Sequence, residues 1–162
     1  MREATLCFLV RGEPIQDVLM GYKKIGFGQG KYTGFGGKVE PGEAVQAAAM
    51  REMEEESGVR VLLEGLRRVG QLTFLFPHQP DWSQLVFVYL AAAWIGQPQE
   101  SNEMEPHWFA IDEIPYAGMW QDGPYWLPPI LEGKYVEGRF VFKEDNESLD
   151  EVKIEQIVDF HT

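Results

Sequence analysis

The feature of this sequence that most constrains its fold is a segment from Glu43 to Ser57 that contains neither glycine nor proline. The segment is rich in Ala, Met, Glu, Gln and Arg, most of which have high helix propensity. Pro41-Gly42 stands immediately before it and Gly58 immediately after it, and both are typical of helix boundaries. The sequence therefore predicts a helix over residues 43–57 that ends where Gly58 adopts a left-handed conformation.

Three glutamates gather on one face of this predicted helix. Because successive helical residues turn by about 100°, Glu52, Glu55 and Glu56 lie within one arc of the surface, whereas Glu54 points away. Like charges on one face repel one another and weaken an isolated helix. Clustered carboxylate oxygens suit Mg²⁺, which keeps water and phosphate oxygens in its other positions. The alternative is an ordinary solvated acidic face, because the formal net charge of the chain is −12.

The spacing around the helix decides between these two interpretations. A glycine, a lone glutamate, an Arg-Glu pair, an aliphatic residue, a Glu-Glu pair and a closing glycine with an aliphatic residue follow one another in order. This pattern resembles the Nudix box in every defined position, and it is far more specific than a glycine-rich loop alone. The matching residues are Gly37, Glu43, Arg51, Glu52, Met53, Glu55, Glu56, Gly58 and Val59.

The resemblance to the Nudix family implies that the box forms a loop-helix-loop that holds divalent ions, Mg²⁺ or alternatively Mn²⁺. Glu52, Glu55 and Glu56 are then the metal ligands, with the carbonyl of Gly37 as a further ligand. The attacking water is oriented either by one of these glutamates or by Glu103, from the loop opposite, which is also a candidate ligand. The choice of general base stays open.

The resemblance also implies an ion pair that fixes the box. Glu43 is expected to pair with Arg51, about two helical turns away, and so to hold the loop against the helix. These two residues complete the predicted catalytic set, and Glu40 in the same loop is a weaker candidate for assisting it.

Segments rich in β-branched and aromatic residues predict strands on both sides of the helix. The predicted strands are Thr5–Val10, Asp17–Tyr22, Val69–Phe76, Leu85–Ile95, Trp108–Ile111 and Arg139–Phe142. The first two are expected to form a hairpin, Tyr125–Leu131 a short helix, and Lys143–Glu147 a solvated turn. This order predicts an α/β or α+β fold with a mixed sheet, which the resemblance places between helices. The 162 residues show no repeat or linker, so we expect one domain over residues 1–162.

Further segments resemble one branch of the Nudix family, the oxidised-purine nucleoside triphosphatases, which act on substrates such as 8-oxo-dGTP. These segments are Gly21–Lys24, Gly26–Val39, Glu100–Met104, Met119–Asp122, Tyr125–Trp126 and Gly138–Phe142. The branch implies attack on the inner phosphate, which gives the monophosphate and pyrophosphate. Aromatic and apolar walls suit a flat purine, although the same side chains are equally compatible with the core. The residues expected to bind substrate are Thr5, Lys23, Phe27, Thr33, Phe74, Met104, Trp120, Asp122, Trp126 and Phe142.

The base-reading half of the predicted site departs from this branch. Asp122 can accept from a guanine-type N–H, or donate when burial keeps it protonated; an exposed loop aspartate is the alternative. Where the branch has an asparagine and a second aspartate, this chain has Thr33 and Gly123. Losing such contacts changes discrimination by about 1–3 kcal/mol each. The reaction is therefore predicted more firmly than the base.

The charge of −12 disfavours nucleic acid polymers and anionic membranes as partners. A small nucleotide substrate meets the same repulsion unless a cation accompanies it. The single Cys7 fits a reducing compartment, and the first apolar run is too short for a signal peptide or a membrane span, so we expect a cytoplasmic protein.

A dinucleoside polyphosphate or nucleotide sugar is an alternative substrate, and a non-catalytic nucleotide sensor is an alternative function. The complete glutamate set argues against the sensor, and the sequence does not predict an oligomeric state.

Overall fold

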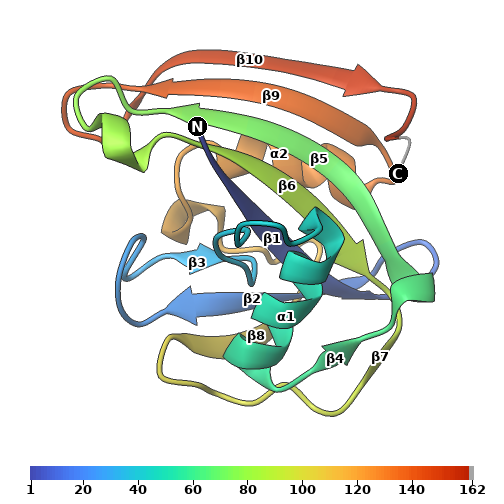
Figure 1. Ribbon diagram of the computed structural model, residues 1–162. Coiled ribbons are helices and arrows are strands. Elements are labelled where there is room, and N and C mark those ends of the chain that lie inside the picture. The colour runs from blue at the N-terminus through green and yellow to red at the C-terminus, as the bar shows by residue number, and fades with distance from the viewer. Residues whose placement is uncertain (161–162) are drawn as a thin grey trace.

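The computed structural model describes residues 1–160, so the end of the predicted domain 1–162 lies outside the described part. An eight-stranded sheet runs in the order β10-β9-β5-β6-β1-β2-β3, with β8 paired to β2 (Figure 1). A second, two-stranded sheet joins β4 and β7. The strands are β1 Arg2–Arg11, β2 Asp17–Lys23, β3 Tyr32–Thr33, β4 Arg60–Val61, β5 Leu66–Leu75, β6 Gln84–Ala91, β7 Trp94–Ile95, β8 Met104–Ala110, β9 Tyr135–Phe142 and β10 Leu149–Ile157, and the helices are α1 Val45–Ser57 and α2 Gly123–Leu131.

The large sheet is mixed, as predicted. Strand β1 pairs in parallel with β6, and β5 pairs in parallel with β9, while the other neighbours are antiparallel. The predicted opening hairpin is short, because β1 and β2 pair only at Val10↔Val18 and Arg11↔Asp17. Strand β2 pairs with β8 along its whole length, from Asp17↔Ala110 to Lys23↔Met104, and beyond Val18 its other edge pairs with β3. The freed edge of β1 bonds instead to the glycine loop, where the Cys7 N–H donates to the Phe35 carbonyl at 2.6 Å.

The two helices cover opposite faces of the sheet. Side chains of β1 alternate between faces: Ala4 and Phe8 pack in the core that includes α2, while Cys7 and Leu9 pack in the core that includes α1. The buried residues of α1 in its core are Ala49 and Met53, and those of α2 in the other core are Trp126, Leu127, Ile130 and Leu131. This confirms an α+β fold with the sheet between helices. Of the helices within residues 1–160, none has both the length and the apolar character that crossing a bilayer demands.

Several predicted boundaries were wrong for local reasons. Helix α1 begins at Val45 rather than Glu43, because Ala44 is extended at φ −68 and ψ 143 and the Glu43 N–H closes a turn on the Glu40 carbonyl. The predicted strand over residues 85–95 is two strands, since β6 ends at Ala91 and β7 pairs with β4. Helix α2 begins two residues earlier than predicted and tolerates two internal prolines.

Strand β10, over Leu149–Ile157, was not predicted at all. It is the outer edge of the sheet, and most of its side chains are exposed. A strand with no buried face has no alternation of apolar and polar residues, which is the signal that predicts strands. The turn over residues 143–147 before it is largely exposed, as predicted.

Candidate active site

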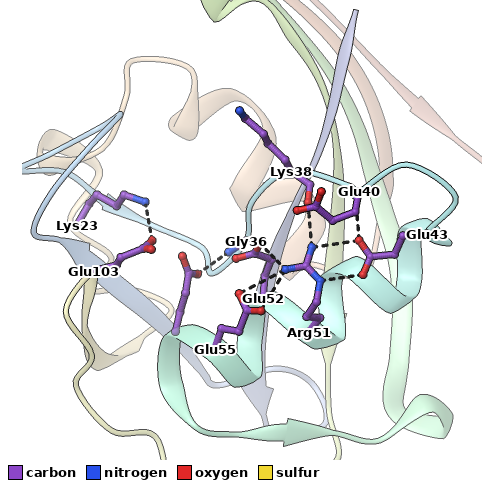
Figure 2. Close-up of polar contacts among 10 residues, drawn as sticks. Lys23, Gly36, Lys38, Glu40, Glu43, Arg51, Glu52, Glu55 and Glu103 are labelled. Atoms are coloured by element: carbon purple, nitrogen blue, oxygen red, sulfur yellow. Dashed lines mark hydrogen bonds and ion pairs between the residues drawn. The ribbon is translucent and has the colours of Figure 1, made fainter.

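Helix α1 brings the glutamates of the box to the glycine loop (Figure 2). The helix ends at Gly58, whose φ is 77 and whose N–H donates to the Glu54 carbonyl. Glu56 is buried, the Glu52 side chain is 15% exposed and that of Glu55 is 58% exposed. Glu54 lies away from them and forms an ion pair with Arg60 at 3.5 Å. The structure thus shows the predicted division between the helix face that carries the cluster and the face that does not.

Arg51 is the centre of the polar network around these glutamates. Its Nε and Nη2 donate to the two carboxylate oxygens of Glu43 at 2.8 and 3.0 Å, a two-point contact that confirms the predicted pair. Its Nη2 also donates to the Lys38 carbonyl at 3.1 Å. Its Nη1 donates to Glu52 at 2.9 Å and lies 3.3 Å from Glu55. Hydrogen bonds from Arg51 lower the pKa of Glu43, so the pair stays ionised.

Glu56 is the most enclosed carboxyl group of the cluster. It accepts a hydrogen bond from the Gly36 N–H at 2.9 Å. Burial raises the pKa of Glu56 to about 8, against the opposing charge of Lys23, and a hydrogen bond with Glu103 adds to the rise. Lys23 also lies 3.5 Å from Glu103. Glu103, predicted to face the helix from the opposite loop, therefore does so.

The glycines of the loop allow its backbone to lie against these carboxylates. A Cβ atom on Gly37 would stand 2.7 Å from the carboxyl group of Glu52, and one on Gly36 would stand 1.7 Å from the Thr5 carbonyl oxygen. The Gly37 carbonyl accepts the Thr5 N–H at 2.9 Å, which leaves it a second lone pair. A larger residue at Gly36 would collide with the backbone of β1, and one at Gly37 would displace the carboxyl group of Glu52.

The donor set at this point suits a hard divalent cation. The carboxylates of Glu52, Glu55, Glu56 and Glu103 and the Gly37 carbonyl are all oxygen ligands, which Mg²⁺ and Mn²⁺ prefer. Within residues 1–160, no three His, Cys, Asp or Glu side chains already converge as metal ligands. The Arg51 guanidinium instead supplies the positive charge beside Glu52 and Glu55. These residues fit the ion chemically.

A cavity of about 300 Å³ extends from this cluster into the molecule. At the carboxylate end its lining includes Glu56, Gly36 and Gly37. All ten residues predicted to bind substrate line the same cavity, namely Thr5, Lys23, Phe27, Thr33, Phe74, Met104, Trp120, Asp122, Trp126 and Phe142. The structure therefore brings them together, and their contact with substrate stays a prediction.

Asp122 lies at the other end of the cavity and is buried, so the alternative of an exposed loop aspartate is wrong. Its Oδ2 accepts the indole N–H of Trp126 at 2.7 Å. Burial raises the pKa of Asp122 to about 6, although the bond from Trp126 and the charge of Lys31 act in the opposite direction. A carboxyl group with this pKa changes its protonation state close to neutral pH.

Two smaller side chains of the cavity are also informative. The hydroxyl of Thr5 is buried without a hydrogen-bond partner in the described part of the chain, a condition that carries an energetic penalty until a ligand satisfies it. Gly123 is packed against Met119, whose Cε would stand 2.7 Å from a Cβ atom placed there. A side chain at position 123 would therefore have to displace the end of Met119.

Comparison with protein-family models gives a match to the NUDIX domain over residues 1–129. The chain belongs to the Nudix family. The "Oxidized purine nucleoside triphosphate hydrolase" of Mus musculus is 44% identical over 131 residues, which cover 81% of this chain and 82% of that protein. The protein of the same name from Danio rerio is 42% identical over 142 residues, or 88% of each chain.

Solved structures agree with the Nudix fold. The MutT protein from Bacillus halodurans superposes with a TM-score of 0.82 over 96% of this chain and 98% of its own, at 21% identity. A MutT Nudix hydrolase from Burkholderia pseudomallei gives a TM-score of 0.62 at 28% identity, covering 70% of this chain and 86% of that one. The likeness to the first of these shows the fold alone.

Two cations of this Nudix site were missed from the sequence. Arg2 and Lys38 line the cavity together with Glu56. Lys38 directly follows Gly37, so its place inside the box could have drawn attention to it. Nothing in the sequence marks Arg2, which reaches the cavity only because β1 begins beside the glycine loop. Glu40 contributes its backbone N–H, which donates to Glu43 at 3.0 Å, rather than its exposed side chain.

Proposed function

We propose that this Nudix protein hydrolyses oxidised purine nucleoside triphosphates, such as 8-oxo-dGTP, to the nucleoside monophosphate and pyrophosphate, with Mg²⁺ as its cofactor. The observation that carries the proposal is the single cavity that joins Glu56 and the glycine loop to an aromatic end with a buried aspartate. The two relatives named for this activity, at 42% and 44% identity, support it.

At the carboxylate end, the chain supplies cations for the phosphate groups and carboxyl groups for the metal ion and the attacking water. Arg2, Lys23 and Lys38 line the cavity and would attract the phosphate chain into an otherwise acidic protein. Glu56, which accepts the Gly36 N–H, and Glu103, which pairs with Lys23, are two carboxyl groups that could accept a proton from an attacking water. Mg²⁺, held by Glu52, Glu55 and Glu56, would neutralise phosphate charge and lower the pKa of bound water.

At the base end, the aromatic walls and Asp122 suit a purine. Phe27 and Trp120 are stacked, with ring centroids 5.2 Å apart, and both line the cavity. Trp126 fixes the orientation of the Asp122 carboxyl group, which can then meet the polar edge of a base. The unpartnered hydroxyl of Thr5 is a second polar group available to a bound nucleotide.

A substrate panel tests the proposal directly. Pyrophosphate release should be measured for 8-oxo-dGTP, a methylated purine triphosphate, dGTP and dCTP, with a dinucleoside polyphosphate and a nucleotide sugar alongside. We expect the oxidised purine to give the highest kcat/KM. Cleavage of only the last two compounds would support the alternative substrates, and binding without cleavage would support the sensor. A cytoplasmic location is part of the same proposal, because the free Cys7 suits a reducing compartment.

Removal of the metal is the second test. EDTA should abolish hydrolysis, and an excess of Mg²⁺ or Mn²⁺ should restore it, because a divalent cation lets the carboxylate cluster approach a triphosphate without charge repulsion. Full activity in EDTA would contradict the metal dependence while leaving the choice of substrate open.

A further inference from the structure

The connection between β9 and β10, over residues 143–148, is built as an ordered tip. Asp145 accepts hydrogen bonds from the backbone N–H groups of Glu147 and Ser148, at 3.0 and 2.8 Å, and from the Ser148 hydroxyl at 2.6 Å. Asn146 adopts a positive φ of 57 within the same turn. The tip lies at the same end of the sheet as the connection that holds Trp82 (Figure 1). Hydrogen bonds within the tip therefore define its conformation without the help of other segments.

Two hydrogen bonds join this tip and the first residue of β10 to segments that lie next to residues of the cavity wall. Glu147 forms an ion pair with Lys31 of the glycine loop at 3.0 Å. The Leu149 N–H donates to the side-chain oxygen of Gln121 at 3.0 Å. Gln121 stands between Trp120 and Asp122, so the second contact holds the segment that carries both base-end residues. Residues 143–149 thus contact segments that form the base end of the cavity, although they lie far from those segments in the sequence.

Lys31, which pairs with Glu147, also contacts the ring of Trp120. Its Nζ lies 4.8 Å from the Trp120 ring centroid, a cation–π distance. The Lys31 side chain is only 21% exposed, which strengthens the attraction compared with a fully solvated lysine. The opposite charge of Glu147 holds the ammonium group in place over the ring.

Trp120 is half-buried and packs against the rings of Phe27, Phe76 and Phe142. A second hollow, of about 330 Å³, lies beside it and is lined by Trp120, Phe27, Trp82, Lys31 and Glu147. The indole is therefore not enclosed on every side. A contact that restricts such a side chain improves its affinity for a stacked base.

We propose that Glu147 and Lys31 are positioning residues that hold Trp120 against the base and so set the affinity of the site for purine nucleotides. This inference rests on the proposed function, because it assumes that the base lies against Trp120. Lys31 contacts Trp120 directly, and its charge also reaches Asp122, so both residues of the pair are placed to change KM for purine substrates while leaving the phosphate chemistry at Glu56 unaffected.

The test compares variants of the pair with a matched control in the same tip. Glu144 is exposed and carries the same charge, so Glu144→Gln changes charge without touching the pair. Glu147→Gln should raise KM for the purine triphosphate about threefold, within the range of a surface ion pair. Lys31→Met should raise it up to about tenfold, because the cation–π contact is lost as well. Lys31→Arg, which also stacks on indole rings, should restore most of the affinity, and kcat should stay within about twofold in every variant.

Coupling between the residues is the sharper readout. Adding Glu147→Gln to Lys31→Met should raise KM no further, because Glu147 acts only through Lys31. Equal KM values for Glu147→Gln and Glu144→Gln, or a fall in kcat without a change in KM, would overturn the proposal.

A measurement without substrate separates this proposal from the proposed function. In protein labelled with 5-fluorotryptophan, the Trp120 fluorine resonance can be identified by its loss in Trp120→Phe. It should shift or broaden in Lys31→Met and Glu147→Gln and stay in place in Glu144→Gln. An unchanged resonance in the first two variants would sink the positioning role even in an active enzyme. A shifted resonance in a protein without purine turnover would leave that role standing and contradict the proposed function.

Discussion

The two ends of the cavity are built in different ways. At the carboxylate end, Glu43, Arg51, Glu52 and Glu56 lie on one helix and the loop before it. Charged hydrogen bonds of 2.8–3.0 Å join the first three, and Glu56 accepts the Gly36 N–H. At the base end, the lining comes from the glycine loop, three strands and the segment that begins α2, and stacked rings dominate its contacts. One end is local in sequence and polar, and the other is assembled from distant segments and largely aromatic.

Because of this difference, the two ends of the cavity should respond differently to substitution of their side chains. At the carboxylate end, hydrolysis depends on the charge and the position of each carboxylate. A neutral side chain of the same size is therefore expected to lower the rate of hydrolysis strongly. Aromatic walls keep most of their buried area when one polar group changes, so substitutions there should alter selectivity more than rate. The predictions below measure this separation, beginning with the largest effect.

The largest effect is expected at Glu56. Glu56→Gln keeps the size of the side chain and removes a charge, so kcat should fall by a factor on the order of 10²–10⁴. The thermal midpoint should change little, because an amide oxygen can still accept the Gly36 N–H. Glu54→Gln is the matched control, since Glu54 lies on the other side of α1 and pairs only with exposed Arg60. Similar losses of kcat in both variants would show that catalysis does not depend on which face of α1 carries the glutamate.

Asp122 gives the corresponding test at the base end. Asp122→Ala should lower kcat/KM for purine triphosphates by about tenfold to a hundredfold, the effect of losing one or two buried polar contacts. Pyrimidine triphosphates, which cannot place the same edge there, should change by less than about twofold. Steady-state kinetics with one purine and one pyrimidine substrate are sufficient. An equal loss for both substrates would assign Asp122 to the fold or to the phosphate site.

The same contrast explains how far the sequence could predict the site. The box was recognisable because its residues occupy fixed positions along one helix and loop, and the resemblance to the Nudix family then implied the Glu43–Arg51 pair. The aromatic lining was named by resemblance. The bond from Trp126 to Asp122 joins residues four apart at the start of α2, whereas the burial of Asp122 depends on how α2 packs over the sheet. The tip at residues 143–148 was interpreted only as a solvated turn, because an ion pair between Lys31 and Glu147 leaves no periodic signal.

The buried carboxyl group of Asp122 also makes stability depend on pH. Burial raises its pKa in the folded protein to about 6, above the ordinary value of 3.8. The folded state therefore binds this proton more tightly than the unfolded state, so the contribution of Asp122 is most favourable below about pH 4 and is lost as the pH rises through about 6. Asp122→Asn keeps an acceptor for Trp126 and removes the titration. It should be more stable than wild type by about 1–3 kcal/mol at pH 7.5 and nearly equal to it at pH 4.

Denaturant unfolding at the two pH values measures this difference. Asp112→Asn serves as the control, because Asp112 is exposed. A constant difference between Asp122→Asn and wild type at both pH values would show that the carboxyl group is already ionised at no cost in the folded protein.

The smallest effect is expected at Gly123, where this chain departs from the related branch. Its φ is not positive, so the backbone accepts a side chain, but a Cβ atom would stand 2.7 Å from the flexible end of Met119. Gly123→Asp should therefore move Met119 at a penalty of about 1 kcal/mol in stability and place a second carboxyl group beside Asp122. The ratio of kcat/KM for 8-oxo-dGTP over dGTP should rise about threefold to tenfold, as expected for one added hydrogen bond. Gly123→Ala introduces the same Cβ atom without the carboxyl group, so an equal rise in both variants would assign the effect to Met119 rather than to base recognition. No rise in either would mean that the base end already reads the purine through Asp122 alone.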